Sequence, residues 1–167
     1  MKILLKNIIY ILFKYGKAIY HSVKYENYKK LYSLPQDFRF NGEGIVFYGD
    51  GEIIIGNRSY IGSYSTVNAS APATVTIGNN CSISHNVRFY TSNKNPIDII
   101  NNNKNIENLY DSIIIGDNCW IGANVFIKEG VSIGDNVVIG ANSMVTKSFP
   151  SNCIIGGVPA KVIKKHD

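Results

Sequence analysis

Residues 115–145 read IGDNCWIGANVFIKEGVSIGDNVVIGANSMV, and an aliphatic residue returns at every sixth position of this stretch without a slip. The repeated aliphatics are Ile115, Ile121, Ile127, Ile133, Ile139 and Val145. An amphipathic helix spaces its apolar residues by three and four, and a half-exposed strand spaces them by two. The period of six fits neither pattern. It predicts short β-strands separated by turns at fixed intervals.

The same period continues toward the N-terminus. Its anchors there are Ile55, Ile61, Val67, Ile77, Ile83 and Phe89. Four positions after an anchor stands a small or medium residue, as at Ser59, Ser65, Cys81, Val87, Cys119, Val125, Val131, Val137 and Ser143. Glycine and asparagine gather in the turns, for example in Gly78-Asn79-Asn80 and Gly116-Asp117-Asn118. Because these residues tolerate positive φ best, we expect left-handed backbone at such corners.

One long interruption breaks the repeat. Residues 92–112 are rich in Asn, contain Pro96 and hold no repeat anchor. Insertions in a solenoid form loops on one face, and such loops commonly carry function. We therefore expect a loop excursion from the coil here. A C-terminal extension is expected over residues 150–167, because Pro150 and Pro159 stop the coil.

Residues 1–36 are a different kind of segment. They hold seven lysines and one glutamate, whereas the whole chain has a net charge of +5. An amphipathic helix is predicted, because its apolar residues fall on one helical face while the lysines sit elsewhere. That face holds Leu4, Ile8, Ile11, Leu12, Tyr15 and Ile19. Two roles remain open for it: covering the open end of a β-core, or contact of residues 1–33 with a membrane surface.

The composition, with 45% apolar and 17% charged residues among 167, is that of a soluble globular domain. The longest apolar run of the N-terminal segment, residues 8–13, is short and flanked by lysines, unlike an export signal or a membrane span. Cys81, Cys119 and Cys153 lack a metal-ligand spacing and fit a reducing compartment. We expect a cytoplasmic protein with no metal and no nucleic-acid partner.

The repeat resembles the hexapeptide-repeat family over roughly residues 44–165. Members of that family fold as a left-handed parallel β-helix whose three-sided coils stack, so that the inward aliphatics form one core. The resemblance implies an all-β fold over residues 37–167, carrying the N-terminal helical segment and the loop excursion. It also implies a homotrimer, because the family's coenzyme groove lies between neighbouring subunits.

Within the family, the C-terminal half is similar to the acetyl-CoA half of bacterial sugar and antibiotic O-acetyltransferases. The similarity is carried by Asn118-Cys119-Trp120-Ile121-Gly122-Ala123-Asn124, Gly140-Ala141-Asn142-Ser143, Val145-Thr146-Lys147 and Val158-Pro159-Ala160-Lys161. It implies acetyl-CoA as co-substrate. The pantetheine groove would be lined by Gly122, Ala123, Ala141 and Thr146. Lysines near the chain's end suit the coenzyme phosphates, namely Lys147, Lys161, Lys164 and Lys165.

Acetyl transfer to a hydroxyl needs a base, and histidine titrates nearest neutral pH. His85 is the one histidine of the coil region, and its corner position predicts an accessible side chain. Many relatives place their catalytic histidine in the loop before a proline, where this chain has Asn95-Pro96. Either His85 has taken over the role or the base lies elsewhere. Asp98 and Asp111 are the candidates to orient the imidazole.

Two further residue types bear on the chemistry. Trp120 stands where sialic-acid O-acetyltransferases of this class carry a functional tryptophan, and we count it as a candidate site residue. A backbone N–H is expected to stabilise the oxyanion. Cys81 and Cys119 occupy inward repeat positions, so no covalent acyl-cysteine step is expected.

The predicted function is transfer of an acetyl group from acetyl-CoA to a hydroxyl of a sugar or polysaccharide. The resemblance is to enzymes that decorate capsule, lipopolysaccharide or sialic-acid residues. The alternatives are an antibiotic acetyltransferase of the chloramphenicol or streptogramin type, a non-catalytic β-helix scaffold, and an inactive paralogue. A γ-type carbonic anhydrase is disfavoured, because its zinc needs three histidines spread over the coils and His85 stands alone there.

Overall fold

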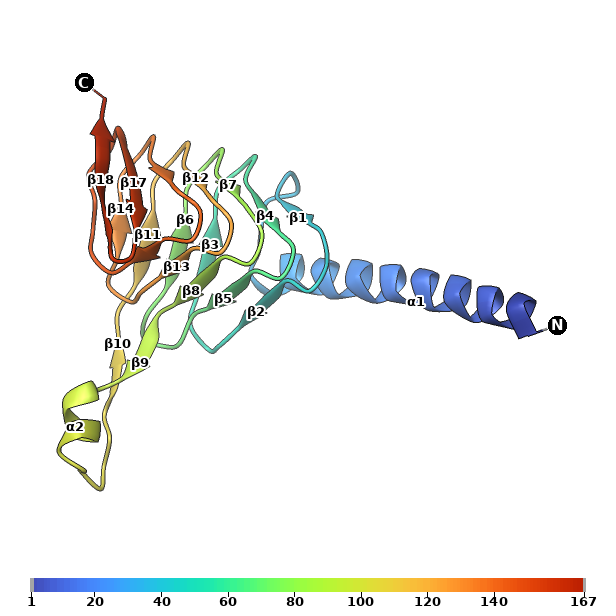
Figure 1. Cartoon of the computed structure of the whole chain (residues 1–167), viewed down its shortest axis with the longest axis horizontal. Helices are drawn as coiled ribbons and strands as arrows, with labels where there is room; N and C mark the ends of the chain where they lie inside the picture. Colours follow the sequence, from blue (N-terminus) through green and yellow to red (C-terminus); the bar gives the residue numbers. More distant parts are fainter. Residues whose placement is uncertain (1, 167) are drawn as a thin grey trace.

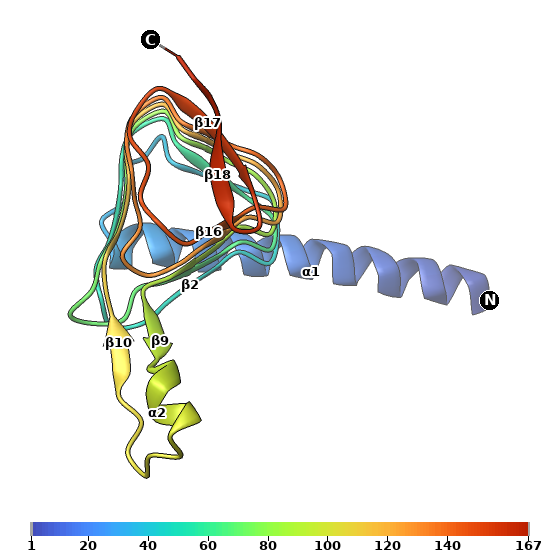
Figure 2. The same ribbon diagram turned by 60° about the vertical axis from the view of Figure 1, so that its left-hand side comes forward.

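The computed structural model describes residues 2–166, which form a three-sided prism of stacked coils with one long helix at its end (Figure 1). Turned by 60°, the coils superpose as a hollow triangle in the ribbon, and the helix projects away from it (Figure 2). The fold is a left-handed parallel β-helix, as the hexapeptide resemblance implied. The two ends of the chain lie at opposite ends of the molecule (Figure 1).

Each side of the prism is one sheet, built from short strands. Sheet 1 contains β1 (Arg39–Asn41), β4 (Tyr60–Gly62), β7 (Ser82–Ile83), β12 (Trp120–Ile121), β15 (Val138–Ile139), β17 (Cys153–Gly157) and β18 (Ala160–Lys165). Sheet 2 contains β2 (Val46–Tyr48), β5 (Thr66–Asn68), β8 (Arg88–Tyr90), β13 (Phe126–Ile127) and β16 (Met144–Val145). Sheet 3 contains β3 (Ile53–Ile55), β6 (Val75–Ile77), β11 (Ile113–Ile115) and β14 (Ser132–Ile133). Neighbouring coils pair in parallel, and within these three sheets only β18 pairs antiparallel, with β17.

The core confirms the period of six. Repeat anchors of successive coils are in register, so that Ile121 lies between Ile83 and Ile139. Every anchor from Ile55 to Val145 is at most 5% exposed, and the small residues four positions later are equally buried. Stacked aliphatics of this kind supply the main stabilisation of a solenoid, since each coil buries its apolar face against its neighbours.

Asparagine and glycine have different roles at the corners of the coils. Asn80, Asn118 and Asn136 have φ near +57°, as expected, and their side-chain amides form a ladder at 3.1 and 3.2 Å. The glycines of the same triplets do not have positive φ. A Cβ on Gly116 would instead lie 2.7 Å from the backbone of Gly134 in the next coil. Glycine is therefore required there for close coil stacking, a role that the spacing alone did not separate from turn formation.

The interruption of the repeat forms an arm, defined here as residues 92–110. Strands β9 (Ser92–Lys94) and β10 (Asn108–Tyr110) pair antiparallel, and the short helix α2 (Pro96–Ile100) lies between them. Asn95 caps this helix by accepting a hydrogen bond from the Ile97 N–H at 3.0 Å. The arm projects from the prism away from its axis (Figures 1 and 2).

Helix α1 (Lys2–Leu31) covers the open end of the core only through its C-terminal third. Tyr25 stacks on Phe40 at 4.5 Å between ring centroids, and Tyr28 stacks on Phe47 at 5.4 Å. The apolar face for which a capping role and a membrane role were left open does not cap the core. Its members Leu4, Ile8, Ile11, Leu12, Tyr15 and Ile19 are between 46% and 67% exposed. The reason is position along the axis: residues 4–19 belong to the part of the helix that extends past the coils, whereas Tyr25 and Tyr28 contact Phe40 and Phe47 of the first coil (Figures 1 and 2).

Candidate active site

Where sheet 1 passes into sheet 2, the corners of successive coils line up along one edge of the prism. This histidine edge consists of residues 62–65, 84–87, 122–125 and 140–143. The Asn124 N–H donates to the carbonyl oxygen of His85 at 3.0 Å, and the Asn142 N–H donates to that of Ala123 at 2.8 Å. These bonds place His85, Ala123 and Ala141 on consecutive coils of the same edge, with Gly122 beside Ala123.

His85 is exposed, as its corner position predicted. Its Nδ1 accepts a hydrogen bond from the backbone N–H of Ser63 at 3.2 Å. Gly62 makes room for the ring, because a Cβ there would lie 2.9 Å from the same Nδ1 atom. A neutral imidazole has one N–H and one lone pair, so this bond assigns the proton of neutral His85 to Nε2.

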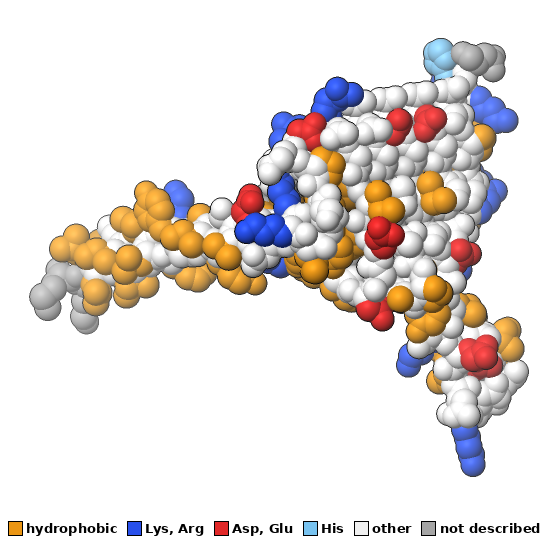
Figure 3. All heavy atoms as spheres, turned by 180° about the vertical axis from the view of Figure 1, so that it is seen from behind, with side chains coloured by type: hydrophobic (Ala, Val, Ile, Leu, Met, Phe, Trp, Pro, Cys, Tyr) orange, Lys and Arg blue, Asp and Glu red, His pale blue; other side chains and the backbone are white. Residues whose placement is uncertain are grey.

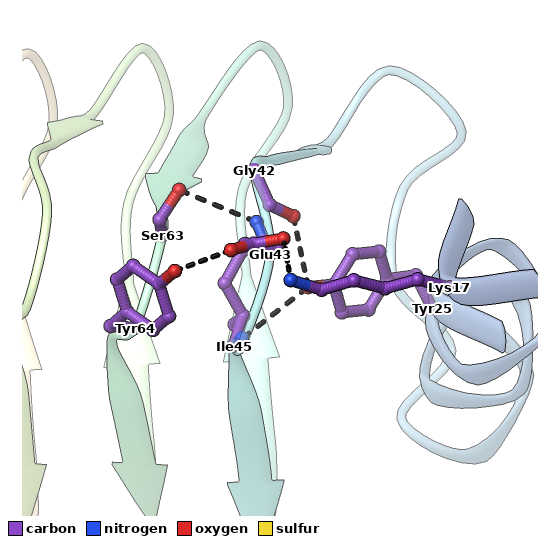
Figure 4. A network of polar contacts seen from close by, with 7 residues as sticks. All are labelled: Lys17, Tyr25, Gly42, Glu43, Ile45, Ser63 and Tyr64. Carbon is purple, nitrogen blue, oxygen red and sulfur yellow. Dashed lines mark hydrogen bonds and ion pairs between the residues drawn. The ribbon is translucent and has the colours of Figure 1, made fainter. Parts of the chain in front are cut away.

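Ser63 connects the histidine edge to helix α1 through Glu43, a network that no sequence pattern predicted (Figure 4). The Glu43 N–H donates to Ser63 Oγ at 3.3 Å, and the Glu43 carboxylate binds Lys17 Nζ at 2.6 Å and the Tyr64 hydroxyl. The Lys17 contact and then the Tyr64 bond lower the pKa of Glu43 from its ordinary value. Lys17 and Glu43 thus fix the middle of α1 against the first coil, two coils before His85.

The carboxylates expected to orient the imidazole do not reach it. Asp98 lies in the arm, where it accepts hydrogen bonds from the Asn103 side chain at 2.7 Å and the Glu107 N–H at 3.0 Å. Asp111 accepts from the N–H of its neighbour Ser112 at 2.8 Å. Both side chains therefore serve the turn geometry of the arm and its base. Within one chain both carboxylates lie at the edge of the prism that carries the arm and not on the histidine edge, so a role of either one in orienting His85 stays a prediction.

Trp120 lies on the outer face of sheet 1, two residues before Gly122, and is 58% exposed. Its exposure means that it does not pack in the core. Lys161 pairs with Gly156 in the last coil, and Lys164 pairs with Ile154 on the same sheet. A cavity of about 360 Å³ opens over Val138 and Ile154, with Lys164 and Lys165 on its wall. Its combination of apolar floor and cationic rim was not foreseen from the sequence.

Thr146 and Lys147 lie on another edge of the prism. This arm edge, where sheet 2 passes into sheet 3, consists of residues 49–52, 68–74, 90–112, 128–131 and 146–148. Lys147 lies over the Phe149 ring, with its Nζ 5.6 Å from the centroid. Within one chain, the residues expected to bind the coenzyme are therefore divided between the histidine edge, sheet 1 and the arm edge.

The arm edge also holds a polar cavity of about 500 Å³ at the base of the arm. Asp50, Ser70, Asn93, Lys94 and Tyr110 contribute to its lining. The backbone around it is fixed from side chains, since Thr91 Oγ1 accepts from the Ser70 N–H at 2.8 Å. Polar hydrogen-bonding groups of this density suit a hydroxylated ligand.

Cys81 and Cys119 are buried on consecutive coils, as their repeat positions predicted. Cys119 donates to the Gly134 carbonyl at 3.3 Å, and its pKa is raised by the hydrogen bond with Cys81 and by burial. A thiol with a raised pKa is a poor nucleophile. Among residues 2–166, no group of three or more His, Cys, Asp or Glu side chains is placed to hold a metal ion.

Comparison with known proteins identifies the class. A family model described as a hexapeptide repeat of succinyl-transferase matches residues 52–87 and 112–147. The crystal structure of a maltose O-acetyltransferase from Clostridium difficile 630 is 35% identical, with a TM-score of 0.61, and the match covers 79% of this chain and 72% of that one. The chain belongs to the hexapeptide-repeat acetyltransferase family.

Two other relatives are informative. The polysialic acid O-acetyltransferase of Escherichia coli O1:K1 / APEC is 41% identical over 133 residues, covering 80% of this chain and 42% of that protein. A hexapeptide-repeat acetyltransferase from Vibrio cholerae O1 biovar eltor, solved in complex with acetyl-CoA, is 26% identical with a TM-score of 0.72, covering 87% of this chain and 77% of that one. The chain spans less than half the length of several curated relatives it matches, between 42% and 47%.

Proposed function

We propose that the protein is an O-acetyltransferase that moves an acetyl group from acetyl-CoA to a hydroxyl of a sugar or polysaccharide. The observation that carries the proposal is the histidine edge, which aligns an exposed His85 with Ala123 and Ala141 on consecutive coils. The named activities of the similar proteins, O-acetylation of polysialic acid and of maltose, give the acceptor class.

The residues present fit acetyl-CoA. A thin pantetheine chain needs an edge of low relief, and a Cβ added to Gly140 would meet no heavy atom nearer than 3.5 Å. Ala123 and Ala141 add small side chains to the same edge. Lys161 on β18 pairs with Gly156 of the last coil. Further along the same strand, Lys164 and Lys165 line the cavity that includes Val138. Ammonium groups bind phosphates well, so this row suits the coenzyme's phosphate groups.

In the proposed reaction the imidazole of His85 takes the proton of the acceptor hydroxyl as its oxygen attacks the thioester carbonyl carbon. The carbon–sulfur bond breaks, coenzyme A leaves as a thiolate, and the thiolate takes the proton back from the imidazolium. No acyl-enzyme forms. Because Ser63 occupies Nδ1, the acceptor hydroxyl has to displace that amide or the ring has to turn. Trp120 on sheet 1 provides an exposed ring against which a sugar can pack.

We further propose that three copies assemble, with the groove completed between neighbours. Two observations support this. The expected coenzyme residues are divided between edges of one chain, so Thr146 and Lys147 reach a groove at the histidine edge only from another copy. The outer faces of the prism also expose apolar side chains, among them Ile54, Ile114 and Met144. Sedimentation equilibrium should give a trimer mass, and a monomer at micromolar concentration would contradict the assembly.

The activity is tested by measuring free thiol release from acetyl-CoA against a panel of sugars, nucleotide sugars, polysaccharides and antibiotics. We expect turnover with a hydroxylated sugar acceptor. Turnover with an antibiotic alone would identify a resistance enzyme instead. Coenzyme binding by calorimetry without turnover on any acceptor would indicate an inactive relative, consistent with the Asn95-Pro96 departure in the arm.

A further inference from the structure

Helix α1 carries a projecting segment, defined here as residues 3–20, and none of its apolar side chains is among the described residues that pack in or against the hydrophobic core. Twelve large apolar side chains of this segment are between 46% and 77% exposed. They are Ile3, Leu4, Leu5, Ile8, Ile9, Tyr10, Ile11, Leu12, Phe13, Tyr15, Ile19 and Tyr20. Figure 3 shows hydrophobic side chains along the helix from its base to its tip. Exposure on this scale marks an interaction surface.

Five of these twelve side chains form a stripe with a defined direction, while others such as Tyr10 and Phe13 lie beside the lysines. At 100° per residue, Leu4, Ile8, Leu12, Tyr15 and Ile19 fall within about 80° of one another around the helix axis. On the opposite side lie Lys6, Lys14, Lys17 and Lys24, and Lys17 is the residue that pairs with Glu43 of the prism at 2.6 Å. Since the lysine side faces the prism at the base of the segment, the stripe points away from it. A flat surface can therefore reach the stripe without meeting the coils.

The positive charge of the segment indicates which kind of partner surface can bind the stripe. Residues 3–25 contain Lys6, Lys14, Lys17 and Lys24 and no aspartate or glutamate. The same stretch of a second copy would bring lysines and no acid to pair with them. An anionic lipid surface supplies both an apolar layer for the stripe and negative headgroups for the lysines. Tyr10, Tyr15 and Tyr20 add amphipathic rings, which favour the boundary between acyl chains and headgroups.

We propose that the projecting segment docks the protein on an anionic membrane surface, lying in its plane with the stripe of Leu4, Ile8, Leu12, Tyr15 and Ile19 inserted. The lysines on the other flank reach the headgroups with their long side chains. Among the described residues, no helix is long and apolar enough to cross a bilayer. The proposal does not depend on the catalytic assignment, because neither the histidine edge nor the arm contributes to the stripe.

The test is flotation of the full chain with vesicles of phosphatidylcholine alone and of an equal mixture of phosphatidylcholine and phosphatidylglycerol. We expect the protein to float with the mixed vesicles, to release as salt is raised, and to stay largely unbound with the neutral vesicles. Ile8→Glu with Leu12→Glu should abolish flotation. Lys6→Gln with Lys14→Gln should lower the partition coefficient about 30-fold, because each lysine near an anionic surface contributes about fivefold, or about 1 kcal/mol.

The matched control changes two equally exposed isoleucines of the arm, Ile97→Glu with Ile100→Glu, and should float as the unchanged protein does. Circular dichroism melts check that all variants fold, which we expect because none of the substituted side chains is buried. Equal flotation with neutral vesicles, or unchanged flotation of the lysine variant, would overturn the anionic surface. Failure to float together with self-association that Ile8→Glu and Leu12→Glu abolish would assign the stripe to a second copy.

Discussion

The backbone N–H of Ser63 donates a hydrogen bond to Nδ1 of His85 at 3.2 Å, from one coil of the histidine edge to the next. This contact fixes the direction of the imidazole and the position of its proton. In the neutral ring Nδ1 is the acceptor, so Nε2 carries hydrogen and is a donor. A histidine held in this way can donate to a carbonyl oxygen at once, whereas proton abstraction requires the Ser63 bond to be broken.

We therefore expect the resting protein to hold neutral His85 as the Nε2–H tautomer. Nitrogen-15 NMR of histidine-labelled protein distinguishes the two ring nitrogens, and Nδ1 of His85 should have the shift of an unprotonated acceptor. Assignment of the signals uses His85→Gln. A protonated Nδ1 in the resting neutral ring would show that the Ser63 bond does not form in solution. A change of tautomer on adding acceptor would support the ring movement in the proposed mechanism.

The Lys17–Glu43 contact predicts a pH dependence for the docking of α1. The pKa of Glu43 is lowered in the folded protein, first by Lys17 and then by Tyr64, so its contribution to stability is complete above its ordinary value of 4.5 and is lost as pH falls through the lowered value. The pKa of Lys17 is raised by Glu43, so the same contact is lost at high pH, as pH rises past 10.5 through the raised value. Both groups are exposed, so we expect a small effect.

The measurement compares thermal melts of the unchanged protein and Glu43→Gln across pH. The difference in melting temperature should be largest between these two limits and should close toward strong acid. Glu107→Gln, an exposed glutamate of the arm, is the charge-matched control and should show no such profile. A difference for Glu43→Gln that persists unchanged at acid pH would mean that packing, and not the ion pair, holds this part of the helix.

Tyr28 predicts where the stabilising part of α1 lies. Its ring stacks on Phe47 and also contacts Phe40, at 5.4 and 6.0 Å between centroids. Removing an aromatic side chain packed on a core in this way costs about 2–4 kcal/mol. Tyr28→Ala should therefore lower the free energy of unfolding, whereas Ile8→Ala should leave it nearly unchanged, because Ile8 is 46% exposed. Urea unfolding measures both, and equal effects would contradict this division of the helix.

The sequence predicted the prism well because one physical rule governs it. Each anchor such as Ile121 must bury itself against Ile83 and Ile139, and a slip of one residue would turn the whole row outward. The packing of the helix was harder to predict. Its existence follows from the spacing of its apolar residues, but the side that packs on the core is set by the contacts of Tyr25 and Tyr28 with Phe40 and Phe47.

The candidate site was predictable in part for a related reason. His85 stood out as the one coil histidine, and its exposure follows from its corner position. The partner of its ring, Ser63, could not be predicted, because Ser63 is a common residue that contributes only a backbone N–H. Backbone donors leave no mark in the sequence. Asp98 and Asp111 looked suitable by residue type, yet local turns of the arm and its base use both carboxylates.

Lys161 predicts an effect on coenzyme binding alone. It lies on β18 opposite Gly156, at the end of the last coil where the proposed groove begins. Losing a hydrogen bond to a charged phosphate costs about 1–3 kcal/mol, so Lys161→Ala should raise the KM for acetyl-CoA by roughly 5- to 150-fold with little change in kcat. Lys104→Ala, an exposed lysine of the arm, is the control. An equal fall in kcat at saturating acetyl-CoA would place Lys161 in the chemical step instead.

His85 carries the sharpest prediction about the reaction. A positioned general base contributes about 10²–10⁴-fold, so His85→Ala should lower kcat by about that factor while the affinity for acetyl-CoA stays nearly the same. The fold should survive, because the side chain is exposed and its main structural contact is the single bond from Ser63. Asn95→His provides the complementary test, since it places a histidine before Pro96 in the arm. If His85 is the base, Asn95→His alone leaves kcat unchanged. Near-full kcat in His85→Ala would overturn the assignment and direct the search for the base to the arm, whereas rescue of that variant by Asn95→His would show that its defect is the loss of a base.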